Sequence, residues 1–246
     1  YWIKTIKEKI DEDWKPSSMF WEVTNRRKDE KTISYAESHD QALVGDKTII
    51  FRLIDADMYW HFQKGDENYN VHRGIALHKM IRLLTASTIN GGYLNFMGNE
   101  IAQLREWDEK REQDWDILKY PNHDSFNRFI KDLNKLYLKE PALSGWDDDP
   151  HGFDWILCGK EQDVVYIFQR VVEENKIVVV MNLSGNTYRD YHFRYGEGGS
   201  MKILMNTDWN KYGGSTKDTM KSIKGVCGDF GFDLPALSVM YLKPVD

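Results

Sequence analysis

Residues 32–40 read Thr-Ile-Ser-Tyr-Ala-Glu-Ser-His-Asp, a short β-prone run followed at once by four polar residues. A second short apolar run, Tyr93–Met97, is closed in the same way by Gly98-Asn99-Glu100. Between the two runs, apolar residues at i, i+3, i+4, i+7 spacing predict a helix over roughly residues 71–87, namely Leu77, Met80, Ile81 and Leu84. Strand, helix and strand in this order predict a parallel pair of strands with a right-handed crossover.

Two further segments carry helical spacing. Near the start of the chain, one helical face holds Trp2, Ile3, Ile6 and Ile10. We expect that helix to end near residues 11–15, since Pro16 follows. A later helix is predicted from Phe126, Phe129, Ile130, Leu133 and Leu136. Asp124 is its expected N-cap, and Pro141 and Gly145 close it.

From Trp146 onward the helical period disappears. Short β-rich runs replace it at residues 155–158, 164–172, 177–183, 188–195, 201–206 and 238–243. Their spacing predicts an antiparallel β-sandwich, so the expected fold class is α/β followed by all-β. We predict two domains, residues 1–143 and 144–246.

The composition excludes several classes of function. The 246 residues contain 33 Lys and Arg against 39 Asp and Glu, a net charge of −6, which offers no basic footprint for nucleic acid. No apolar run approaches the ~20 residues of a membrane span, so we expect no membrane partner. Cys158 and Cys227 form no CxxC pair, which favours a reducing, cytoplasmic location.

Polar residues follow both predicted parallel strands. Glu37, His39 and Asp40 follow the first strand, and Asn99 and Glu100 follow the second. The carboxyl ends of parallel strands form the functional face of α/β folds, so these side chains should meet at one rim. The roughly 30 residues between Asp40 and the next predicted helix exceed the usual connection of ~2–6, as a binding loop would. Ion pairs and caps use the same residue types, and on spacing alone a structural role is as well supported as a catalytic one.

Two other polar groups are weaker candidates. Asp147-Asp148-Asp149 lacks the glycine and terminal glutamate of an EF-hand loop, so we interpret it as a solvated linker. His72 and His78 lie six residues apart and do not share a helical face as a metal pair would. We therefore read both as surface or packing histidines and expect neither a metal ion nor a cofactor.

Several motifs resemble a known family. The run Tyr35-Ala36-Glu37-Ser38-His39-Asp40-Gln41-Ala42-Leu43-Val44-Gly45-Asp46-Lys47-Thr48 resembles the fourth signature region of 1,4-α-glucan (glycogen) branching enzymes of the α-amylase superfamily. The runs over residues 73–82 and 93–100, Arg105-Glu106-Trp107 and Asn206-Thr207-Asp208 are similar to the same family.

The resemblance implies a retaining glucanotransferase. An α-1,4 bond is cut, a glucosyl-enzyme ester forms, and the 6-hydroxyl of another glucan chain attacks it to give an α-1,6 branch. By resemblance, Asp40 is the acid that stabilises the oxocarbenium-like transition state. The residues implied to bind substrate are His39, Glu37, Gln41 and Glu100.

The resemblance covers only the C-terminal part of that family. It implies that residues 1–143 supply the end of an eight-stranded (β/α)8 barrel, from its sixth to its eighth helix, followed by the family's C-terminal β-sandwich. The nucleophile and the acid/base would follow earlier strands, so we expect this chain alone to be inactive on glucan. Its expected partners are an α-glucan and the upstream half of the enzyme, and unpaired strand edges also favour self-association.

Two alternatives stay open. The chain could derive from an α-amylase-like hydrolase or a debranching enzyme, although the run Ala42–Lys47 favours branching. It could also be a noncatalytic glucan-binding module, in which the Trp-rich sandwich docks polysaccharide by stacking.

Overall fold

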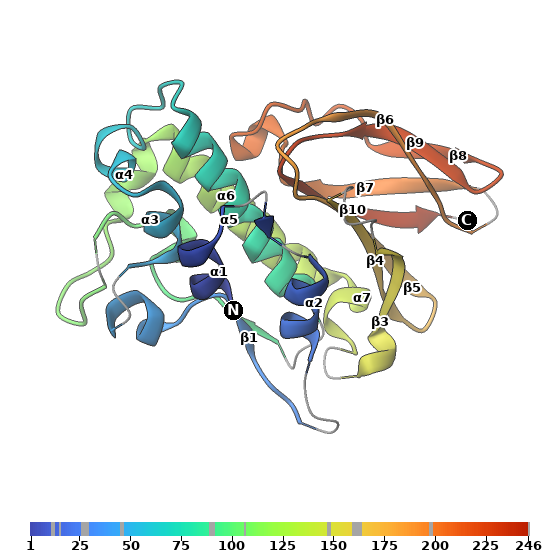
Figure 1. Cartoon of the computed structure of the whole chain (residues 1–246), viewed down its shortest axis with the longest axis horizontal. Coiled ribbons are helices and arrows are strands. Elements are labelled where there is room, and N and C mark those ends of the chain that lie inside the picture. The colour runs from blue at the N-terminus through green and yellow to red at the C-terminus, as the bar shows by residue number, and fades with distance from the viewer. Residues whose placement is uncertain are drawn as a thin grey trace.

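The computed structural model describes residues 1–10, 13–14, 16–25, 30–44, 47–88, 92–105, 107–146, 149–158, 164–196 and 199–245. The helices lie in the first part of the chain and the long strands in the second (Figure 1). Two long helices run between the N-terminal segments and the sheet, α5 (Tyr69–Ser87) and α6 (Pro121–Lys139). The predicted linker residues Asp147 and Asp148 lie outside the described residues.

The predicted strand, helix and strand unit is present. β1 (Ser34–Tyr35) pairs in parallel with β2 (Tyr93–Leu94), with Ser34 opposite Tyr93, and α5 connects the two strands. The side chain of Asn68 caps α5 by accepting the amide of Val71 at 3.0 Å. Each strand has only two residues, and in the described part of the chain no third strand joins them. The barrel wall expected of residues 1–143 is therefore not formed here beyond this parallel pair.

The long connection after Asp40 is helical, not an extended loop. It contains η2 (Asp40–Val44), α3 (Ile49–Ile54) and α4 (Asp57–Trp60). The buried apolar residues of α3 and α4 are Ile49, Ile50, Leu53, Ile54 and Met58. Their spacing is helical, so burial of one face against α5 explains the two short helices.

α3 and α5 approach closely at a glycine. A Cβ atom at Gly74 would lie 2.2 Å from Cγ1 of Ile54, well inside van der Waals contact. Only a residue without a side chain fits there, because the interior is already filled at normal density.

The N-terminal helices also depart from expectation. α1 (Trp2–Glu8) forms as predicted, but Pro16 begins a further helix, α2 (Pro16–Thr24). Pro is favoured in the first turn of a helix because the amide it lacks has no partner there in any case. The same effect moves the start of α6 to Pro121 with Tyr120 as N-cap, so the prediction of Asp124 as N-cap is wrong. The helical part ends with α7 (Pro141–Ser144).

The described part of the second half forms one antiparallel sheet of eight strands in the order β3-β4-β5-β10-β7-β8-β9-β6. The strands are β3 (Phe153–Cys158), β4 (Val165–Val172), β5 (Asn175–Asn182), β6 (Tyr188–Arg194), β7 (Ser200–Asn206), β8 (Ser222–Val226), β9 (Asp229–Leu234) and β10 (Ser238–Val245). β8 pairs with β7 through residues 222–224 and with β9 through residues 225–226. The sheet curls so that β6 and β9 lie over β7 and β10 (Figure 1). The expected sandwich is thus one sheet folded on itself.

Buried polar contacts join the two halves. Arg170 of β4 is fully buried and donates to the carbonyl oxygens of Ser87 and Gly152, both at 3.0 Å. The hydroxyls of Tyr241 and Ser87 lie 2.6 Å apart. Nζ of Lys79 donates to the carbonyl oxygens of residues 207 and 212 at 2.6 and 3.0 Å. These contacts fix the position of α5 against the all-β half.

Candidate functional site

Asp40 and His39 stand exposed just after β1. Each side chain is 67% exposed, and Nε2 of His39 lies 3.2 Å from Oδ1 of Asp40. Asp40 begins η2, a single π-helical turn, a local widening that often marks functional positions. The acid and the imidazole therefore lie side by side and exposed after the carboxyl end of a parallel strand, and their roles in binding a sugar stay predictions.

Glu37 has a different environment. Its side chain is completely buried, Oε1 accepts a hydrogen bond from Nη2 of Arg82 at 2.7 Å, and Oε2 accepts the amide of Ile49 at 2.7 Å. A carboxylate with no exposed surface and both oxygens engaged cannot contact a sugar directly. The prediction that Glu37 binds substrate is corrected to a positioning role, since Glu37 ties β1 to the first turn of α3 and to α5.

Arg82 also contacts His78, one turn earlier in α5. Nε of Arg82 donates to Nε2 of His78 at 3.0 Å, and the His78 ring stacks on Phe126 with centroids 4.9 Å apart. Burial, and secondarily the charge of Arg82, hold the pKa of His78 well below its usual value. His78 is thus a neutral packing histidine, as expected, whereas His72 is 44% exposed beside Glu67.

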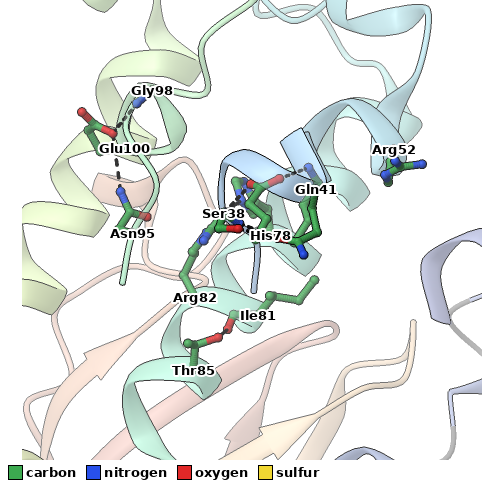
Figure 2. A network of polar contacts seen from close by, with 12 residues as sticks. Ser38, Gln41, Arg52, His78, Ile81, Arg82, Thr85, Asn95, Gly98 and Glu100 are labelled. Carbon is green, nitrogen blue, oxygen red and sulfur yellow. Dashed lines mark hydrogen bonds and ion pairs between the residues drawn. The ribbon is translucent and has the colours of Figure 1, made fainter. Parts of the chain in front are cut away.

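Gln41 stabilises the turn that carries Asp40. Its Oε1 accepts both the amide and the hydroxyl of Ser38 at 2.8 Å, and the Ser38 hydroxyl in turn accepts the amide of Asp40 at 3.3 Å. Figure 2 shows Gln41 and Ser38 facing each other above Arg82 and His78 of α5. The side-chain oxygen of Gln41 is therefore already engaged. Contact between Gln41 and a sugar stays a prediction, and it would have to be made by the amide nitrogen of Gln41.

Glu100 belongs to a second cluster at the end of β2, in η3 (Asn99–Ile101). Its Oε2 accepts the amide of Gly98 at 2.8 Å and Nδ2 of Asn95 at 3.4 Å. This cluster lies to one side of the Ser38 turn in Figure 2. Glu100 is half-buried, and its predicted contact with substrate stays a prediction.

Among the described residues, the carboxylate nearest to Asp40 in sequence is not available for catalysis. Retaining glycosyl transfer needs two carboxyl groups about 5 Å apart, one as nucleophile and one as acid/base. Glu37, the carboxylate nearest to Asp40 in sequence, is buried and forms an ion pair with Arg82. Among the described residues no group of three or more His, Cys, Asp or Glu could hold a metal ion. No helix in the described ranges is long and apolar enough to cross a membrane.

The sheet matches a known protein-family model. Residues 155–245 match the family model "Alpha amylase, C-terminal all-beta domain". The chain is 36% identical over 230 residues to a 1,4-alpha-glucan-branching enzyme of Yarrowia lipolytica, 38% identical to that of Felis catus, and 39% identical over 234 residues to enzyme 2-2 of Arabidopsis thaliana. These alignments cover 87% of this chain and 31%, 31% and 28% of the relatives. The chain thus spans about a third of the length of the curated relatives it matches.

Solved structures share the fold at low identity. An α-amylase from Geobacillus thermoleovorans complexed with acarbose superposes with a TM-score of 0.50 at 13% identity, over 72% of this chain and 36% of that one. A variant of AmyP in complex with maltotriose gives a TM-score of 0.50 at 16% identity over 73% of this chain and 36% of that one. Such coverage exceeds residues 155–245, so the likeness in fold extends into the helical half.

Proposed function

We propose, from its similarity to about a third of the length of 1,4-alpha-glucan-branching enzymes, that this chain is part of a glucanotransferase that forms α-1,6 branch points. The observation that carries the proposal is the exposed pair of Asp40 and His39 at the carboxyl end of β1. In this reading, Asp40 accepts hydrogen bonds from the hydroxyls of one glucosyl unit, and His39 binds the same sugar.

Asp40 would act through charge and hydrogen bonding. As the scissile bond breaks, positive charge develops on the sugar ring, and hydrogen bonds to its hydroxyls strengthen. A carboxylate fixed beside the ring stabilises that charge more than it stabilises the ground state, and this difference lowers the barrier. The Ser38 and Gln41 hydrogen bonds hold the turn, so little reorganisation is needed during the reaction.

We further propose that residues 1–143 form the end of an eight-stranded barrel completed by upstream residues. Support comes from the parallel β1 and β2 pair and from the likeness in fold that extends into the helical half. A cavity of about 990 Å³ adjoins β1, lined by residues of α1, α2 and β1. An upstream strand would enter this cavity and pair with the free edge of β1. Without it, that edge is the surface along which copies of the chain would associate.

The test of activity joins residues 1–246 to the upstream part of a related enzyme, such as that of Yarrowia lipolytica. We expect the joined protein to branch amylose and the 246-residue chain alone to be inactive, because a stabilising carboxylate without a nucleophile forms no ester. Branched product separates this function from hydrolysis, which would release free reducing ends instead. Branching by the isolated chain would refute the division of the site.

The test of Asp40 uses a matched control. Asp190 is also an exposed carboxylate beside a histidine, with Oδ1 3.1 Å from Nε2 of His192, but it lies in the all-β half. In the joined protein, Asp40→Asn should reduce branching by more than about 100-fold, as removal of an electrostatic stabiliser does, whereas Asp190→Asn should leave it unchanged. Equal effects of the two substitutions would contradict the role of Asp40 and favour a noncatalytic glucan-binding module.

A further inference from the structure

A second cavity lies between the α3 and α4 segment and residues 104–111. Its volume is about 830 Å³, within the range of ligand sites. One wall is formed by Lys47, Thr48, Phe51 and Tyr59, and the other includes Leu104, Arg105, Trp107 and Asp108. The two walls come after β1 and β2 in the chain, as Asp40 comes after β1.

Aromatic rings stand on both walls. Tyr59 is 64% exposed and rests against Phe51, with ring centroids 5.3 Å apart. On the opposite wall, Trp107 contacts Phe96 edge to face at 6.2 Å, a contact that fixes the orientation of the indole. Two large rings, each held by a second ring, offer apolar surfaces to the cavity.

A hydroxyl group on the cavity wall lacks its usual partner. Thr48 is the N-cap residue of α3, yet its side chain makes no cap hydrogen bond. Its Oγ1 is buried with no hydrogen-bond partner among the described residues. Threonine at an N-cap normally accepts an amide of the first turn, and without that hydrogen bond the buried Thr48 hydroxyl is available to a ligand.

A smaller adjoining hollow is also lined by a buried polar atom without a hydrogen-bond partner among the described residues. Thr48, Arg105 and Trp107 line both spaces, and the hollow is also lined by Asn99. Asn99 is only 3% exposed, and its Nδ2 has no partner in the part of the chain that the structure describes. The hollow has a volume of only about 10 Å³, so a hydroxyl-rich molecule in the larger cavity would supply a partner for Thr48 alone.

Two of the three cations that line the cavity, Lys47 and Arg105, are already paired with carboxylates, and the third, Arg111, shares the wall with Asp108 and Glu109, which together favour a neutral ligand. Nε of Arg105 lies 2.9 Å from Oδ2 of Asp114, and Nζ of Lys47 lies 2.7 Å from Oδ1 of Asp55. A phosphate or carboxylate ligand would have to compete with these carboxylates for the cations. Hydroxyl groups can instead add to such paired groups without displacing them.

We propose that this cavity binds a segment of an α-1,4-linked glucan, with Tyr59 and Trp107 stacking on sugar rings and Thr48 hydrogen bonding to a sugar hydroxyl. This inference rests on the proposed function and extends it, because it adds a binding site beyond Asp40 and His39. Both sites follow the same strand, so one glucan chain can occupy the cavity while another part of it lies at Asp40.

The experiment is titration of the full 246-residue chain with maltoheptaose, followed by calorimetry and by tryptophan fluorescence. Trp107→Ala and Tyr59→Ala should each weaken binding by roughly 10- to 30-fold, as loss of a central aromatic contact does. The matched control is Trp60→Ala, since Trp60 follows Tyr59 in α4 and is 65% exposed but does not line the cavity. Trp60→Ala should leave the affinity unchanged.

Thr48→Val separates an effect on binding from an effect on folding, because affinity and the unfolding midpoint are both measured. It should weaken maltoheptaose binding several-fold while leaving the unfolding midpoint unchanged or higher, because the described residues offer the hydroxyl no hydrogen-bond partner. A lower midpoint with unchanged affinity would show that the hydroxyl serves the fold and would overturn the proposal. Displacement of maltoheptaose by inorganic phosphate would also overturn it, since the site would then select an anion.

Asp40→Asn separates the two proposals. If Trp107→Ala abolishes binding and Asp40→Asn has no effect on either binding or branching, the cavity binds glucan but the proposed function fails. If Asp40→Asn reduces branching in the joined protein and neither Trp107→Ala nor Tyr59→Ala changes affinity, the proposed function stands and the cavity proposal is wrong.

Discussion

Substitution of Arg82 by Met should destabilise the chain strongly. Arg82 is 4% exposed, and its guanidinium pairs with the fully buried Glu37 at 2.7 Å while also donating to His78. Methionine fills much of the same volume but leaves the carboxylate of Glu37 buried with only the amide of Ile49 as partner. Removal of one member of a buried ion pair costs about 3–5 kcal/mol, a large part of the ~5–15 kcal/mol that stabilises a typical domain.

The measurement is urea unfolding at neutral pH, with linear extrapolation to zero denaturant. Arg128→Met is the matched control, because Arg128 pairs with Asp124 at 2.6 Å but both side chains are about half exposed, and it should cost at most about 1 kcal/mol. The double substitution Glu37→Gln with Arg82→Met should recover part of the loss, since no buried charge is then left alone. A cost for Arg82→Met no larger than that of Arg128→Met would refute the reasoning.

Three further predictions concern other contacts. Gly74→Ala should lower the unfolding free energy by about 1–3 kcal/mol through overpacking, whereas Gly185→Ala, which meets nothing within 4 Å, should be nearly neutral in the same urea assay. Burial lowers the pKa of Lys79 from 10.5 to about 8. Between about pH 8 and 10 the unfolded chain therefore binds one more proton than the folded chain, and the free energy of unfolding should rise with pH. Lys79→Met should remove that rise in thermal melts. A hydrogen bond to Asp229 raises the pKa of His192 above 6.5. The contribution of His192 to stability should therefore be present below pH 6.5 and be lost as pH rises through the pKa of the folded state. Asp229→Asn should lower the pKa of His192 in an NMR titration.

Periodicity predicted α5 well but could not show the role of its polar residues. The helix forms over residues 69–87, yet His78, Lys79 and Arg82 are buried along with the apolar face. The partners of Arg82 and Lys79 outside α5 lie 45 to 133 residues away in sequence. A single buried polar side chain is tolerated only when its partners are in place, and spacing within one helix carries no information about distant partners.

Other differences between the predicted and the observed secondary structure concern α3, β8 and β9, where glycine and aspartate residues masked a local pattern. Ile49, Ile50, Leu53 and Ile54 follow helical spacing, but Gly and Asp residues on either side made the connection read as a loop. β8 and β9 were not predicted because glycine weakens the strand signal at Gly225 and Gly231. Gly225 is required by packing, since a Cβ atom there would lie 2.6 Å from the ring of Phe230. The exposed position of Asp40 after β1, in contrast, agrees with what strand order predicted.

The all-β half acts on the candidate site through α5. Arg170 and Tyr241 of the sheet hold the last turn of α5, and Lys79 holds its middle. Arg82 projects from this fixed helix onto Glu37, and Glu37 joins the residues before Asp40 to the start of α3. Each of these contacts is buried and polar, so a shift of the helix would leave several charged or hydrogen-bonding groups without partners at once. The position of Asp40 therefore depends on the sheet, although no strand of the sheet supplies a residue to the rim.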